Sequence, residues 1–199
     1  MIALVVSRAR VDIDKIAGYV ERCQTPDGGF CFACVPPGGA MDTYHALMAL
    51  RLLGRRPARV RAARQWVETT AAKLLPGHPR TVFHLTQAGR LLGVPRATRR
   101  RWAAGLGQWR NEKGGFGGWR DVYVEAPSEL ETTYFAVLAE ADLGLGTRRD
   151  AVTRFVLSLQ NTDGGFGGNG RSALASTSFA VSILARAGHG QHELAPAGE

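Results

Sequence analysis

Two glutamates stand one residue apart at the start of an apolar segment, in the run Ser128-Glu129-Leu130-Glu131-Thr132-Thr133-Tyr134. This run is expected to open a helix, with Ser128 as its cap and the acids at the positive helix end. Buried carboxyl groups hold their protons more tightly, which suits general acid chemistry. The sequence therefore leaves a capping role and a catalytic role open for Glu129 and Glu131.

Two histidines hold the same place in two matching segments. His45 follows Tyr44 and His84 follows Phe83, each near the start of a stretch that ends in Leu-Leu-Gly. If this position faces a cavity, the two imidazoles lie close together. They could then bind an anionic group or transfer a proton near neutral pH. Hydrogen-bonded core histidines would give the same pattern, so both interpretations remain open.

The three cysteines, Cys23, Cys31 and Cys34, include one C-x-x-C pair. A structural zinc site usually takes four ligands, so this pair would need Asp42 or His45 to complete it. We expect free thiols packed beside phenylalanines instead. Three cysteines are also too few for a disulfide framework, which predicts a reducing, cytoplasmic location.

A repeated unit must position these candidate residues, because one glycine motif occurs three times along the chain. Asp27-Gly28-Gly29-Phe30 returns as Lys113-Gly114-Gly115-Phe116 and as Asp163-Gly164-Gly165-Phe166. The glycines predict a sharp turn with positive φ, and the phenylalanine should fill the gap between neighbouring helical hairpins. Apolar residues spaced i, i+3, i+4, i+7 precede each motif and predict an amphipathic helix. These stripes are Ile16, Tyr19, Val20 and Cys23; Trp102, Gly105, Leu106 and Trp109; and Val152, Phe155, Val156 and Leu159.

A second segment recurs downstream, at 44–54, 83–93, 134–144 and 178–188. Its copies are apolar around most of the helix circumference, which predicts buried helices. Each copy ends at a glycine suited to a left-handed cap.

The predicted unit is therefore a helix, a glycine loop, a second helix and a glycine cap. Four units fit, at 10–55, 56–94, 95–145 and 146–189, and the predicted fold is all-α. We expect one domain over 1–188 and a flexible tail over 189–199.

Composition excludes several classes of protein. The chain has 199 residues, 45% of them hydrophobic, which argues against disorder, and no apolar run is long enough to cross a bilayer. The run Met1 to Val6 is too short for a signal peptide. The net charge is +8, carried almost entirely by arginine. The arginines are scattered, which argues against nucleic acid and leaves compositional bias or an anionic ligand.

The run Gln160-Asn161-Thr162-Asp163-Gly164-Gly165-Phe166-Gly167-Gly168, followed by Thr177-Ser178-Phe179-Ala180, resembles a known repeat. It is similar to that of protein prenyltransferase β subunits and squalene-hopene-type (class II) terpene cyclases. The resemblance covers residues 10–188. It implies an α/α toroid whose second helices line a cavity that holds an isoprenoid. Four hairpins are fewer than such toroids usually have, so it implies a short or partial barrel that a second copy or a partner chain completes.

The resemblance also implies site residues. Class II cyclases carry Asp-x-Asp-Asp-Thr at the start of an inner helix, and its middle acid protonates an alkene or epoxide. Glu129, Glu131 and Thr133 match the first acid, the middle acid and the threonine, while Thr132 replaces the last acid. Glu131 is then the general acid, with Glu129 and Thr133 in support.

The prenyltransferase comparison involves the same run. An Asp-x-Cys-Tyr motif supplies two zinc ligands there, and Thr133 stands where the thiolate should be. A Tyr-His pair supplies the third ligand, and Asp42-Thr43-Tyr44-His45 resembles that segment. The order differs and the cysteine is missing, so we expect no metal cofactor, with magnesium or zinc as the open alternative.

Further residues would shape the cavity. Aromatic faces stabilise developing cations, although the same residues also pack helical cores. Arginines in loops before the inner helices would lie at the mouth, where a diphosphate would rest, or would be solvated surface charges. The aromatic candidates are Tyr44, Phe83, Tyr134, Phe135 and Phe179, and the arginines are Arg80, Arg120 and Arg171.

The resulting hypothesis is a cytoplasmic isoprenoid-processing enzyme that resembles a class II terpene cyclase. Asp42, Glu129 and Glu131 are its candidate catalytic acids, and His45 and His84 bind the substrate. The alternatives are a non-catalytic helical repeat that binds a protein or a hydrophobic ligand, and a prenyltransferase-like enzyme.

Overall fold

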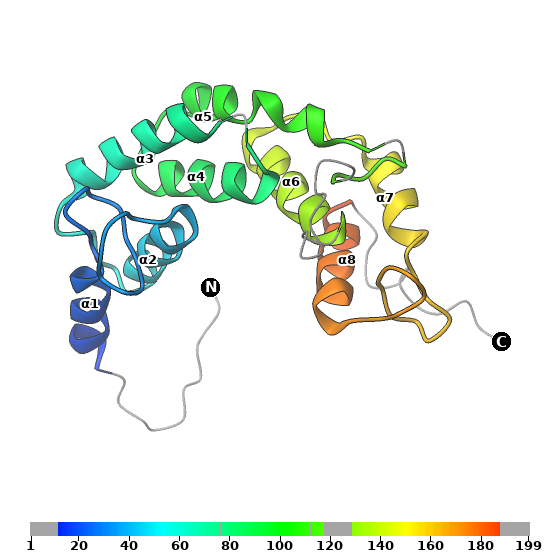
Figure 1. Ribbon diagram of the computed structural model, residues 1–199, viewed down its shortest axis with the longest axis horizontal. Coiled ribbons are helices and arrows are strands. Elements are labelled where there is room, and N and C mark those ends of the chain that lie inside the picture. The colour runs from blue at the N-terminus through cyan, green and yellow to red at the C-terminus, as the bar shows by residue number, and fades with distance from the viewer. Residues whose placement is uncertain (1–11, 76, 112, 118–128, 188–199) are drawn as a thin grey trace.

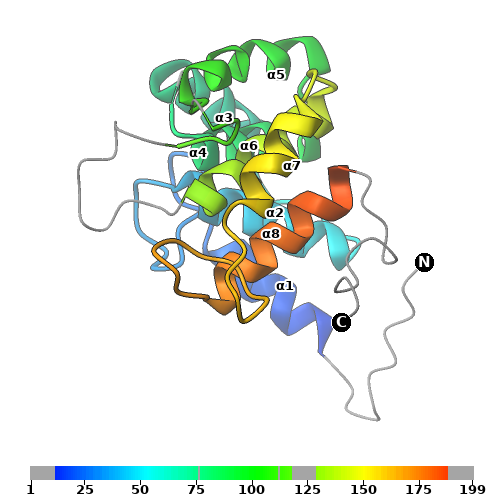
Figure 2. The ribbon, with the colours of Figure 1, turned by 90° about the vertical axis from the view of Figure 1, so that its right-hand side faces the viewer.

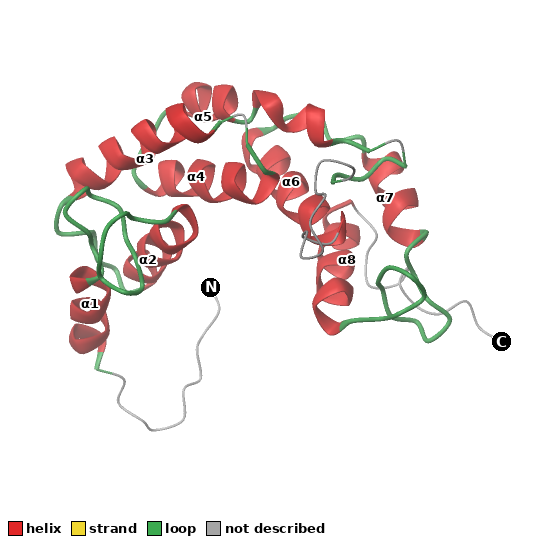
Figure 3. Ribbon diagram, viewed as in Figure 1, coloured by secondary structure: helices red, strands yellow, loops and turns green. Residues whose placement is uncertain are grey.

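A computed structural model describes residues 12–75, 77–111, 113–117 and 129–187. Helices form this part of the chain, and the described residues contain no β-strand (Figure 3). The predicted all-α fold is confirmed. The expected flexible tail at 189–199 lies outside the described residues.

The helices alternate between two layers of a curved arc (Figure 1). The inner helices are α2 (Ala40–Leu52), α4 (Pro79–Leu91), α6 (Glu129–Leu143) and α8 (Leu174–Ala187), and each packs against the next in this order. The outer elements are α1 (Ile13–Arg22), α3 (Val60–Leu74), α5 (Arg96–Trp102) with the 3₁₀ helix η1 (Ala104–Trp109), and α7 (Arg149–Leu157). This is the predicted α/α arrangement, and Figure 2 shows the outer helix α7 running alongside the inner helix α8.

The Gly-Gly-Phe motif makes the expected turn in all three copies. Gly28, Gly114 and Gly164 have φ values of 101°, 99° and 82°, a region that side chains disfavour. The turn brings the phenylalanine back beside the end of the outer helix, as the bridges Gln24–Phe30, Arg110–Phe116 and Gln160–Phe166 show. All three phenylalanines are buried, at 5% exposure or less.

A threonine in each following inner helix holds this loop in place. The Thr43 hydroxyl accepts a hydrogen bond from the backbone N–H of Phe30 at 2.9 Å. Thr133 does the same for Phe116 at 2.9 Å, and Thr177 for Phe166 at 3.0 Å. The loop and the inner helix are therefore locked together by the same contact three times.

The third outer helix differs from the prediction. The expected stripe from Trp102 to Trp109 is divided, because α5 ends at Trp102 and η1 continues in 3₁₀ geometry. Gly105 and Gly107 lie in this stretch. Glycine lowers helix propensity, and the tighter 3₁₀ turn suits such short pieces.

The glycine caps are confirmed where the structure describes them. Gly54, Gly93 and Gly144 have φ values of 69°, 75° and 60°. The fourth, Gly188, lies outside the described residues.

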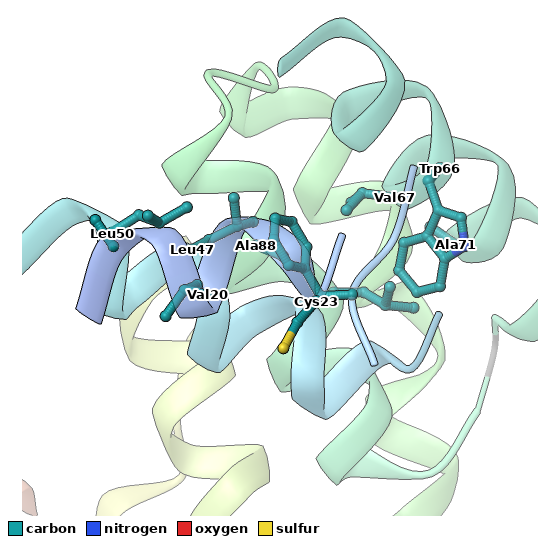
Figure 4. Close-up of a cluster of buried hydrophobic side chains, with 11 residues drawn as sticks. Val20, Cys23, Leu47, Leu50, Trp66, Val67, Ala71 and Ala88 are labelled. Carbon is teal, nitrogen blue, oxygen red and sulfur yellow. The ribbon is translucent and has the colours of Figure 1, made fainter. Parts of the chain in front are cut away.

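Each pair of hairpins shares a hydrophobic core between its layers. Figure 4 shows one such cluster, where Leu47 and Leu50 of α2 meet Val20 of α1 and Val67 of α3. α4 lies between two other inner helices and is buried over most of its length. Among the described helices, α2 and α8 each pack against one inner helix, and both carry exposed apolar side chains, including Leu52 at 80% and Val181 at 43%.

Candidate active site

The inner helices place aromatic rings at one repeat position. Tyr44 and His45 of α2, Phe83 and His84 of α4, and Tyr134 and Phe135 of α6 occupy matching pairs of positions, and Phe179 of α8 follows Ser178 in the same way. Since α2, α4, α6 and α8 pack in sequence, this register brings the rings side by side. We call these seven residues, Tyr44, His45, Phe83, His84, Tyr134, Phe135 and Phe179, the aromatic row.

Ring contacts run without a break along the row. The rings of Tyr44 and His84 stack with centroids 5.5 Å apart, and those of His84 and Phe135 meet edge to face at 5.4 Å. Tyr134 contacts Phe135 at 5.3 Å and Phe179 at 5.0 Å. All are within the range of favourable aromatic pairs. Residues at matching repeat positions in the sequence therefore lie side by side on four neighbouring helices.

A pocket of about 390 Å³ opens along the row. Its apolar wall comes from Tyr44, Phe83, Tyr134 and Phe135, with Met41 at one end. Both histidines line it as well, with their ring centroids 5.7 Å apart. The pocket thus combines cation-stabilising faces with groups that can exchange protons or bind anions.

Glu131 and Arg80 supply the charges of this pocket. The Glu131 carboxylate, on the first turn of α6, forms an ion pair with the Arg80 guanidinium on the first turn of α4. The Arg80 guanidinium also lies over the Phe135 ring, 5.6 Å from its centroid. Among the described residues, Glu131 is the one carboxylate that lines the pocket. Its position at a helix N-terminus favours a negative charge.

The start of α4 positions Arg80. His78 caps this helix, its Nδ1 accepting a hydrogen bond from the Arg80 backbone N–H at 3.2 Å, and Pro79 occupies the first turn. The His78 ring also contacts the Trp109 ring, with the ring centroids 5.1 Å apart, which connects the cap of α4 to the outer element η1. Sequence reasoning missed His78 and Met41, although proline after a capping residue is a recognisable helix start.

Burial makes His84 a neutral histidine. It is 3% exposed, and burial, with the nearby charges of His45 and Arg80, lowers its pKa to about 4. At neutral pH it therefore lines the pocket uncharged, while His45, its counterpart on α2, is exposed.

Several predicted site residues lie elsewhere. Asp42 lines an adjacent groove of about 230 Å³, which shares His45 with the pocket, and its carboxylate accepts a hydrogen bond from the Phe32 N–H at 3.3 Å. Glu129 contacts the Asn111 side chain at 3.4 Å and does not line the pocket. Thr133 is fully buried, with its hydroxyl engaged by Phe116. The reason is helix geometry, because residues one or two positions apart on α2 and α6 point in different directions.

The arginines expected at the mouth of the cavity also differ in where they lie. Arg80 lies in the pocket, whereas Arg171 is exposed in the loop before α8 and does not line it. Arg120, and the expected cap Ser128, lie outside the described residues.

The residues do not fit a prenyltransferase-type zinc site. Glu131 is paired with Arg80, and Thr133, at the thiolate position, has its hydroxyl committed to the Phe116 backbone. In the described part of the chain, no three histidine, cysteine or acidic side chains converge as metal ligands.

A further ion pair, less exposed than Arg80–Glu131, joins Arg110 to Glu140. Arg110 replaces the glutamine found at this place in the other two loops, and it contacts Glu140 of α6 at 2.8 Å. Burial raises the Glu140 pKa, and Arg110 opposes this shift. The guanidinium lies 4.4 Å from the centroid of the Phe116 ring. This pair joins the third loop to its inner helix.

None of the described helices combines the length and the apolar character that crossing a bilayer requires. A family model described as the prenyltransferase alpha-alpha toroid domain matches residues 1–77 and 60–187. No curated protein matches the chain.

Proposed function

Because the chain belongs to the prenyltransferase α/α-toroid family, we propose that it processes an isoprenoid in the pocket along the aromatic row, by acid-initiated cyclisation as in class II terpene cyclases. The observation that carries this proposal is the meeting of Glu131 with the faces of Tyr134 and Phe135 in one pocket. An acid, an apolar wall and cation-stabilising rings are what such a reaction requires.

Arg80 controls the state of Glu131 in this proposal. A carboxylate paired with a guanidinium has no proton to donate, so the ion pair must open before the reaction starts. The Arg80 side chain is 39% exposed, which leaves it able to turn toward an anionic head group such as a diphosphate. Glu131 then loses this ion pair and takes up a proton from solvent, which it can give to the substrate.

The proton then moves from the Glu131 carboxyl group to a terminal alkene carbon of the isoprenoid. The resulting carbocation lies against the faces of Tyr134 and Phe135 while an internal double bond attacks it and closes a ring. Loss of a proton from a neighbouring carbon forms the new alkene. His45, at the exposed end of the pocket, is the base that accepts this proton.

A non-catalytic ligand-binding role is the second candidate. The Arg80–Glu131 ion pair favours it, because a permanent pair would leave the pocket with rings but no acid. The two functions share the ligand and differ in whether it is transformed.

A product assay tests the proposal. Purified protein is incubated with farnesyl diphosphate, geranylgeranyl diphosphate and squalene in separate reactions, and extracts are analysed by gas chromatography and mass spectrometry after phosphatase treatment. Glu131→Gln is the test variant. Glu129→Gln is its matched control, because Glu129 is the same residue type on the same helix but does not line the pocket.

We expect a cyclic product from the wild type and from Glu129→Gln, and a loss of at least a hundredfold in Glu131→Gln, the scale of a general acid. Equal product from wild type and Glu131→Gln would remove Glu131 from its role. Binding of an isoprenoid without any turnover would favour the non-catalytic function.

A further inference from the structure

The loop between α1 and α2 brings two cysteines from different elements into contact. Cys23 is the C-terminal cap of α1, and Cys34 lies in the loop that follows the Phe30 turn. Their Sγ atoms are 3.3 Å apart. Cys23 is 6% exposed and Cys34 is exposed, so one thiol is reachable from solvent and the other is directly behind it.

Backbone hydrogen bonds hold both cysteines in this arrangement. The Cys31 N–H donates to the Cys23 carbonyl at 3.1 Å, which fixes the start of the loop to the end of α1. The Cys34 N–H donates to the Cys31 carbonyl at 2.9 Å and closes a tight turn. The Gly39 N–H donates to the Phe30 carbonyl at 2.9 Å and closes the loop at its far end.

The conformation of Cys34 is unusual for its residue type. Its φ is 56°, in the left-handed region where glycine and asparagine are the common choices. A cysteine at this position carries a conformational penalty that glycine would avoid. The same conformation turns its side chain toward Cys23.

We propose that Cys23 and Cys34 are a redox pair, which forms a reversible disulfide with a small-molecule disulfide such as oxidised glutathione and leaves Cys31 as a free thiol. The proposed disulfide joins residues 11 positions apart in the chain. Cys34 is then not available to pair with Cys31 of the C-x-x-C motif. This proposal concerns the thiols alone and does not depend on the proposed catalytic function.

The reaction proceeds in two exchanges. The exposed Cys34 thiolate attacks one sulfur of oxidised glutathione, forming a mixed disulfide and releasing one glutathione thiolate. The Cys23 thiolate then attacks Cys34 Sγ, forming the internal disulfide and releasing the second glutathione thiolate. Two protein thiols are oxidised and one glutathione disulfide is reduced to two thiols, with the two protein protons passing to solvent or glutathione.

The order of the steps follows from burial. Burial raises the pKa of the Cys23 thiol, so few Cys23 thiolates are present at neutral pH. Cys34 is the accessible nucleophile, and Cys23 reacts once the mixed disulfide lies beside it.

The pair lies next to a groove that adjoins the pocket. Cys23, Phe32 and Asp42 line this groove, and His45 lines both the groove and the pocket. The Phe32 N–H already donates to Asp42 at 3.3 Å. A disulfide would fasten the loop over this side of α2, beside the exposed histidine.

Thiol counting on the folded chain tests the proposal. The protein is incubated with oxidised glutathione at neutral pH, the remaining thiols are alkylated, and the intact mass and the peptide map are measured. The wild type should lose two of its three thiols without retaining glutathione, and the map should join Cys23 to Cys34. Reduction with dithiothreitol should restore all three thiols.

Single variants separate the possible pairings. Cys31→Ser should form the same disulfide and retain no free thiol, whereas Cys34→Ser should form no internal disulfide. Cys34→Ser changes an exposed side chain, so its folding is not in question. The oxidised wild type should also melt on the order of 5 °C above the reduced form, a difference that Cys34→Ser should lack. A Cys31–Cys34 bond in the map would overturn the proposal, and so would glutathione that stays on Cys34.

Discussion

Arg80 of α4 and Glu131 of α6 form an ion pair across two neighbouring inner helices, at the edge of the pocket along the aromatic row. The pair joins the candidate acid to the cation that would bind an anionic head group. The position of the Arg80 side chain determines whether this ion pair is made. A substrate that attracts Arg80 therefore changes the chemistry available at Glu131.

Thr133 is expected to be a structural residue. Replacing it with valine removes the hydroxyl that accepts the Phe116 N–H, which should lower the free energy of unfolding by about 1–3 kcal/mol. Thr177→Val breaks the equivalent, less buried contact with Phe166 and should lower it less. Urea unfolding measures both. Product formation per folded molecule should be unchanged in Thr133→Val, and a selective loss of activity would restore a substrate role for Thr133.

His84 should make the fold sensitive to acid. Its folded-state pKa, about 4, lies below the ordinary value of 6.5, so the unfolded chain binds the proton more tightly. This contribution to stability is complete above pH 6.5 and is lost as the pH falls toward 4, by up to about 3 kcal/mol.

The repeat itself supplies the variants for this test. His84→Phe places the residue that α6 carries at the same position, and its unfolding free energy should change less between pH 7 and pH 4 than that of the wild type. His45→Phe, at the exposed counterpart, should keep most of the change. Equal acid sensitivity in the wild type and His84→Phe would contradict the neutral, buried state of His84.

Arg110 and Glu140 should behave as one unit. The other two loops carry Gln24 and Gln160 in place of Arg110, and the matching inner helices carry leucine in place of Glu140. Arg110→Gln alone leaves a buried carboxylate without its partner and should cost about 3–5 kcal/mol.

The double variant Arg110→Gln/Glu140→Leu recreates the combination of the other repeats and should recover most of that loss. A double-mutant cycle in urea measures the coupling, which we expect to reach about 2 kcal/mol or more. Additive single effects would show that the two side chains act independently.

Gly28 and Gly164 test what the turn requires. Both have positive φ, but a Cβ on Gly28 would overlap the Ala62 backbone carbonyl, whereas one on Gly164 would have nothing within 4 Å. Gly164→Ala should therefore cost about 1–2 kcal/mol from conformation alone. Gly28→Ala should cost roughly 3 kcal/mol or more, because the clash adds to it. Equal losses of unfolding free energy in the two variants would mean that the close approach of Gly28 to α3 does not affect the cost of the substitution.

The features that the sequence could predict are those that residue type and local spacing determine. The glycine loops, the buried Phe30, Phe116 and Phe166, and the three caps that the structure describes follow from residue type and spacing, and appear as expected. The shared position of His45 and His84 likewise follows from the repeat register. The split after Trp102 was missed because the apolar stripe outweighed the weak helix propensity of Gly105 and Gly107.

Long-range pairing was beyond the sequence, whereas the different side-chain directions on α6 follow from the helical period. The family resemblance grouped Glu129, Glu131 and Thr133 of α6. Their side chains contact three different residues, which are Asn111, Arg80 and Phe116, respectively. The pairing of Arg80 with Glu131 depends on how α4 packs against α6, which no local pattern encodes. The Asp42 carboxylate accepts the Phe32 N–H in the adjoining groove, a contact between the loop and α2 that no local pattern encodes either.

The source of the initiating proton is the most direct test of the account. In the proposed mechanism Glu131 takes its proton from solvent before each turnover, so a reaction run in deuterium oxide should give a cyclic product that carries one deuterium at the former terminal alkene carbon. Mass spectrometry of the product from the diphosphate or squalene reaction measures this label. Deuterium at that carbon is the result we predict. A cyclic product without the label would contradict Glu131 as the acid, and from a diphosphate substrate it would show that ionisation of the head group starts the reaction.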